Sequence, residues 1–62
     1  MFKAIKENRE YRNTMEIIKG EMARNQKGTV IYLNYQTTVN RLKEKNFEVK
    51  YNGCGMYIIT WK

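Results

Sequence analysis

The sequence predicts a single α+β domain, residues 1–62, in which a three-stranded antiparallel sheet packs against two helices. Three observations lead to this prediction. A long amphipathic stretch opens the chain, short β-branched and aromatic runs recur in its second half, and 62 residues suffice for one domain only. The predicted order of elements is therefore helix, strand, helix, strand, strand.

Residues 2–25 are predicted to form an amphipathic helix, because apolar side chains recur along one stripe at spacings of three, four and seven residues. The stripe consists of Ala4, Tyr11, Met15, Ile18 and Met22, with Phe2, Ile5 and Ile17 on its flank. We expect it to cover the sheet, although the same spacing also suits a helix-mediated homodimer. Gly20 interrupts the pattern and either ends the helix early or lets another element approach closely.

Residues 25–28 are predicted to form a turn, in which Gly28 or Asn25 takes a positive φ after the helix. Residues 29–33 are β-branched and aromatic, which is typical of a short strand. This strand is apolar on both faces, as expected of a strand inside a covered sheet.

Residues 35–46 are predicted to form the second helix, with Asn34 as its N-cap. Tyr35, Val39 and Leu42 would line the buried face. Asn46 can adopt the left-handed conformation that ends the helix.

Residues 47–51 alternate in hydrophobicity, and residues 56–61 form the most apolar run of the chain. Together they predict a β-hairpin, whose last strand is expected to lie between the other two. Ile59 and its alternate neighbours form the heavier apolar face of the last strand, and this face must lie on the same side as Val49. Matching the two faces requires an odd number of residues in the loop. A three- or five-residue loop with a left-handed Gly is therefore favoured over a tight two-residue Asn-Gly turn.

The residue types argue against catalysis. The chain has no His and no Asp, which removes catalytic triads, His general bases and His-containing metal sites. The Glu residues of the first helix are expected to form solvated ion pairs that contribute little. Cys54, the only cysteine, lies between two glycines and is interpreted as a bystander thiol. We therefore expect no enzyme activity, no cofactor and no metal.

The net charge of +6 favours an acidic partner such as nucleic acid. The charge is spread evenly, with a net +3 in residues 1–27 (seven basic, four acidic) and +3 in residues 28–62 (five basic, two acidic). No apolar run approaches the ~18 residues of a membrane span, so no membrane association is expected. The single cysteine fits a reducing cytoplasm.

A strand, a helix and a hairpin in succession resemble the back half of a winged-helix domain, whose helix enters the major groove. The fold is therefore predicted to be a truncated relative of that domain, with one helix where a winged helix has a helix-turn-helix. The candidate nucleic-acid residues on the exposed helix face are Gln36, Thr37, Asn40 and Arg41, for base edges. Those placed to meet phosphates are Lys45, Lys50 and Asn52.

Residues 15–61 contain several short patterns: Gly28 before a strand, Val39-x-x-Leu42 on a helix, Asn46-Phe47-x-Val49 entering a strand, and Tyr57-x-Ile59-x-Trp61 in the last strand. Together these patterns resemble a group of small proteins from tailed bacteriophages. The group usually has Gly-Tyr in place of Asn46-Phe47. The resemblance implies a phage or prophage origin, expression in a bacterial cytoplasm and a non-enzymatic accessory role. It brings no catalytic residues.

The leading expectation is a phage-type accessory protein that binds a macromolecule without catalysis, with nucleic acid ahead of protein. The alternative is a phage inhibitor that binds a host or defence-system protein, for example as an anti-CRISPR protein does. A homodimeric structural component, paired through the stripe of the first helix, is a third possibility.

Overall fold

The computed structural model describes residues 2–61 of the chain, with side chains from residue 5 onward. The side chains of Phe2 and Ala4, which the sequence places on the stripe of the first helix, lie outside the described part. The elements are α1 (Phe2–Ala23), β1 (Gly28–Tyr32), α2 (Gln36–Glu44), β2 (Glu48–Gly53) and β3 (Met56–Thr60). This order, with one three-stranded antiparallel sheet, confirms the predicted fold class.

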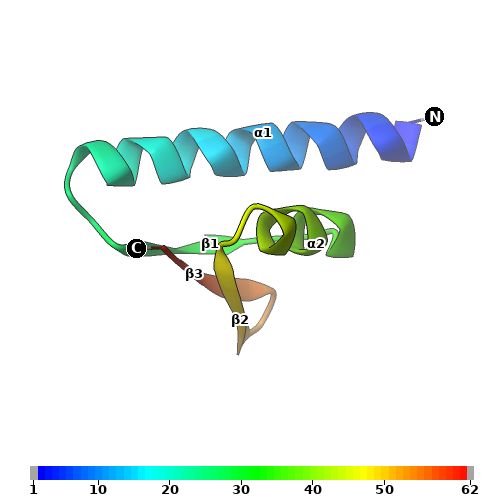
Figure 1. Cartoon of the computed structure of the whole chain (residues 1–62). Coiled ribbons are helices and arrows are strands. Elements are labelled where there is room, and N and C mark those ends of the chain that lie inside the picture. Colours follow the sequence, from blue (N-terminus) through cyan, green and yellow to red (C-terminus); the bar gives the residue numbers. More distant parts are fainter. Residues whose placement is uncertain (1, 62) are drawn as a thin grey trace.

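The sheet has the strand order β1-β3-β2, so the last strand is central, as predicted. Ile59 pairs with Thr29 on one side and with Val49 on the other, which fixes the register of both antiparallel pairs. Figure 1 shows α1 running along the molecule above α2 and the sheet. Both helices pack on the same side, so the sheet has one covered face and one open face.

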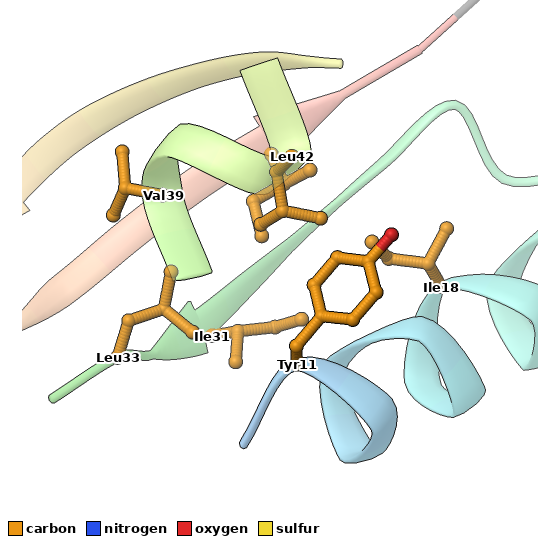
Figure 2. Packing of buried hydrophobic residues seen from close by; sticks show 7 residues of the cluster. Tyr11, Ile18, Ile31, Leu33, Val39 and Leu42 are labelled. Carbon is orange, nitrogen blue, oxygen red and sulfur yellow. The ribbon is translucent and has the colours of Figure 1, made fainter. Parts of the chain in front are cut away.

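The core lies between the helices and the covered face of the sheet (Figure 2). Its buried apolar members are Tyr11, Ile18, Ile31, Leu33, Val39, Leu42 and Ile59. The predicted stripe of α1 is thus used inside the chain, because Tyr11 and Ile18 are buried there and Met15 packs beside them. The prediction that this helix covers the sheet is confirmed, and the middle of the stripe is not free to pair with a second helix.

The start of α2 differs from the prediction. Asn34 is not the N-cap; Tyr35 occupies that position and its side chain makes no capping hydrogen bond. The carboxylate of Glu10 on α1 instead binds the backbone that leads into the helix. It accepts hydrogen bonds from the Asn34 N–H at 2.7 Å and the Tyr35 N–H at 3.2 Å. It also accepts the hydroxyl of the fully buried Thr38 at 2.6 Å, so α1 supplies the negative charge that the N-terminus of α2 favours.

The end of α1 is set by Asn25, which has φ 63°, and not by Gly28. The Gln26 N–H reaches back to the Glu21 carbonyl at 3.0 Å, which closes a Schellman motif. Gly20 does not end the helix, which continues to Ala23. It does not make room for a neighbour either, since an added Cβ would meet nothing within 4 Å. Both predicted explanations of Gly20 are wrong.

The end of α2 follows the prediction. Asn46 has φ 70°, and the Phe47 N–H donates to the Leu42 carbonyl at 3.1 Å in a second Schellman motif. Phe47 then packs against the core and meets the Trp61 ring edge-on, with 6.1 Å between centroids. This stop directs the chain from α2 into β2.

The hairpin turn is shorter than predicted. Cys54 and Gly55 form a two-residue turn with φ values of 53° and 76°. The parity argument was correct, because Tyr51 does pair with Tyr57 on the covered side. The extra residue sits in a β-bulge at Asn52, so the odd spacing comes from the strand and not from a longer loop.

Candidate nucleic-acid interface

The residues predicted on the outer side of α2 are exposed there, as the pattern indicated. Gln36 and Asn40 are bound to each other, with 3.2 Å between Nε2 and Oδ1. Thr37 and Asn40 border a shallow hollow whose other lining residues are Glu7, Asn8, Arg41 and Glu44. This hollow has two carboxylates and one guanidinium, a net charge of −1. Phosphate groups would be repelled there.

Arg41 is committed to packing between the helices. Its guanidinium carbon lies 3.7 Å from the centroid of the Tyr11 ring, a cation–π contact. Its Nη1 also donates to the Asn8 Oδ1 at 3.0 Å. Arg41 thus joins α2 to α1. A nucleobase could bind its guanidinium only by displacing these two contacts.

Lys50 and α2 lie on opposite sides of the sheet. Lys50 pairs with Ile58, whereas the adjacent Val49–Ile59 pair faces the helices. The Lys50 Nζ lies 3.9 Å from Glu48 Oε1, and both side chains are well exposed. Asn52 occupies the bulge near the hairpin tip. The structure therefore does not gather the predicted residues on one helix–hairpin surface.

A different concave surface lies between α1 and the C-terminal end of α2. Its lining residues are Tyr11, Arg12, Met15, Glu16, Lys19, Lys45 and Phe47, and we call it the α1–α2 groove. Of the predicted residues it contains only Lys45. Arg12 and Lys19 were missed because they were read as part of the solvated charged side of the first helix.

The sequence explains how these groups come together. Arg12 and Lys19 are seven residues apart, so they lie on the same side of α1. Lys45 follows the last turn of α2, where the helix dipole favours a cation. The shared face of Arg12 and Lys19 on α1 could have been predicted from their spacing in the sequence. Their closeness to Lys45 depends on how the two helices pack.

The α1–α2 groove has an excess of positive charge. Arg12, Lys19 and Lys45 oppose one carboxylate, Glu16, for a net charge of +2. Among residues 5–61, ion pairs form at Arg24–Glu21 and Lys50–Glu48. Both pairs lie outside the groove, so its cations remain available to an anionic ligand.

The inner wall of the groove is aromatic and apolar. Tyr11 is buried beneath Arg41, while Phe47 and Met15 are half-buried. Cations around an aromatic floor suit a ligand that combines negative charge with flat apolar surfaces. Nucleic acid has this combination.

Comparison with family models, curated proteins and solved structures finds no match to this chain. Within residues 2–61, no helix has the length and apolar character needed to cross a membrane. The described part of the chain also holds no cluster of three or more acidic or Cys side chains arranged around a metal position.

Proposed function

We propose that this protein binds nucleic acid through the α1–α2 groove. The observation that carries the proposal is the set of three cations, Arg12, Lys19 and Lys45, which have no ion-pair partner among the described residues and surround an aromatic wall. Such a groove attracts phosphates by charge and offers the half-buried Phe47 and Met15 side chains as apolar contacts for unpaired bases. The groove replaces the outer face of α2 as the proposed site, because the hollow on that face is lined by Glu7 and Glu44.

The proposed role is accessory and non-catalytic. The absence of His and Asp from the sequence supports binding over acid–base chemistry. The proposed setting, a tailed-phage protein in a bacterial cytoplasm, rests on the sequence resemblance.

The test is fluorescence anisotropy with labelled single- and double-stranded DNA at about 50 and 200 mM salt. The Lys19→Gln/Lys45→Gln double variant should bind more weakly, and its log–log salt slope should fall by roughly one for each lost phosphate contact. The matched control, Lys27→Gln/Lys50→Gln, removes the same charge outside the groove. It should retain most of the affinity and the original slope.

Equal losses in the two double variants would contradict the groove, because binding would then follow net charge alone. A larger loss in the control would point back to Lys50 and the hairpin. No salt-dependent binding to either DNA form would overturn the proposed function.

A second candidate is inhibition of a host or defence-system protein, favoured by the open face of the sheet. Val30 and Tyr32 on this face are 50% and 56% exposed, and exposed Tyr is common in protein interfaces. Affinity capture from a nuclease-treated bacterial lysate tests it. One protein retained by the wild-type chain and lost with Tyr32→Ser would favour this candidate over nucleic acid.

A further inference from the structure

The two edges of the sheet differ in how they are protected. β2 carries two charged residues, Glu48 and Lys50, and a bulge at Asn52, all features that discourage pairing with another strand. β1 forms the other edge and has the sequence Gly-Thr-Val-Ile-Tyr, without charge, proline or bulge. By the same criteria, β1 is open to pairing.

The outer edge of β1 makes no hydrogen bond in the described part of the chain. The β1 ladder runs to β3 alone. The remaining backbone bonds and the side-chain bonds between residues 5 and 61 all involve other segments. A row of backbone donors and acceptors therefore faces outward along this edge.

A groove between α1 and this edge would receive the side chains of an added strand. Its apolar lining includes Ile17, Ile31 and Tyr35. Ile17 is 46% exposed although it is a large apolar residue, and it lies on the side of α1 that overhangs the edge. Alternate side chains of an extended peptide could be covered here.

The charge beside the groove is positive. Lys6 and Arg9 line it, and neither forms an ion pair within the described residues. The one carboxylate in the groove, Glu10, already accepts hydrogen bonds from Tyr35 and its neighbours. An acidic strand would be attracted, whereas a second copy of this basic chain would bring the same cations toward Lys6 and Arg9.

We propose that the outer edge of β1 binds an extended acidic segment of a partner protein, which joins the sheet as a fourth strand. Backbone hydrogen bonds to β1 hold the segment. Its apolar side chains enter the groove beside Ile17, and its carboxylates face Lys6 and Arg9. This site is separate from the α1–α2 groove and does not depend on nucleic-acid binding.

The probe is a labelled eight-residue peptide, the Val-Glu peptide, with Thr at every second position and two Val and two Glu at the positions between, so that Val and Glu project from the same face toward α1. It is made with the Glu pair nearer either end and compared with the same peptides carrying Lys in place of Glu. The Val-Glu peptide should bind the whole protein and slow amide exchange in residues 28–32, and the Val-Lys peptide should not bind. Two further peptides carry N-methyl groups on one or the other set of alternate residues. One of them should lose binding, because only one set of amides faces β1.

Two double variants test the cations. Lys6→Gln/Arg9→Gln should weaken binding of the Val-Glu peptide on the order of tenfold, from two lost surface charge contacts. Lys43→Gln/Lys50→Gln removes the same charge elsewhere and should leave the affinity nearly unchanged. Circular dichroism checks that both variants fold, as expected for exposed positions.

Three results would overturn the proposal. The first is equal binding of the Val-Glu and Val-Lys peptides, or binding of both N-methylated forms. The second is loss of peptide binding with Lys19→Gln/Lys45→Gln but not with Lys6→Gln/Arg9→Gln, which would place the acidic peptide in the α1–α2 groove. The third is a stable dimer in sedimentation whose contacts run through β1, because a second copy would then occupy this edge.

Discussion

At the scale of single residues, Glu10 forms long-range hydrogen bonds that the residues around it in the sequence do not predict. One carboxylate accepts three hydrogen bonds from a segment about 25 residues away and holds the start of α2 against α1. The sequence predicts solvated ion pairs for the Glu residues of this helix, and Glu10 departs from that prediction. Nothing local distinguishes it from Glu16, because its partners come from the other helix.

Replacing Glu10 with Gln tests this connection. The amide keeps one oxygen acceptor but loses the charge and the second acceptor, so the free energy of unfolding should fall by about 1–2 kcal/mol. Urea denaturation followed by circular dichroism measures the change. Glu16→Gln is the control, because Glu16 is exposed and should shift stability by less than about 0.5 kcal/mol. Equal effects of the two substitutions would show that the contacts of Glu10 contribute nothing.

At the scale of elements, the same glycine substitution should act with opposite sign in α1 and in the hairpin. Gly20 lies within the helix, and an added Cβ meets nothing within 4 Å. Gly53 has the same free space but a φ of +94°, which disfavours a side chain. The difference is therefore one of backbone conformation and not of packing.

Gly20→Ala should stabilise the protein by about 1 kcal/mol, because Ala is the better helix former. Gly53→Ala should destabilise it by about 1–2 kcal/mol, the cost of a left-handed non-glycine residue. Thermal denaturation of the two variants beside the wild type measures both changes. A loss of stability in Gly20→Ala would mean that this glycine has a role in packing that the structure does not show.

The elements were predictable to the extent that local patterns specify them. Helical spacing, β-branched and aromatic composition, and period-2 alternation together identified all five elements, and parity placed Val49 and Ile59 on the covered face. The start of α2 and the hairpin turn were not predictable in the same way. The first depends on Glu10 from another element, and the second on a bulge at Asn52 that no residue type in the turn requires.

At the scale of the whole molecule, positive charge is poorly compensated. The chain carries a net +6, and the ion pairs among its described residues are surface contacts 3.6 and 3.9 Å long, which contribute little. Mutual repulsion of the cations opposes the compact state. Added salt screens this repulsion.

Raising NaCl from about 20 to 200 mM should therefore raise the melting temperature. A gain of about 0.5 kcal/mol corresponds to roughly 2–4 °C for a domain of this size. Lys27→Glu lowers the net charge from +6 to +4 and should reduce the response. An equal salt response in both proteins, measured by calorimetry, would contradict electrostatic repulsion as the cause.

The candidate site was less predictable than the fold. Lys45 was among the predicted residues and Arg12 and Lys19 were not, because the proposed groove is lined by side chains from separate elements. Arg41 has a residue type suited to base recognition, yet its guanidinium stacks on Tyr11. Residue type indicates what a side chain can bind, while the packing of the helices decides whether it is free to do so.

The central position of β3 has a consequence for folding during synthesis on the ribosome. β1 and β2 do not pair with each other; each is hydrogen-bonded only to β3, which follows both in the chain. Until residues 56–60 have been synthesised, the two earlier strands have no partner within the chain, and their pairing must wait. The β2–β3 hairpin is local, but the β1–β3 pairing forms late and over a long sequence separation, so a chaperone that shields β1 during that interval should raise the yield of folded protein.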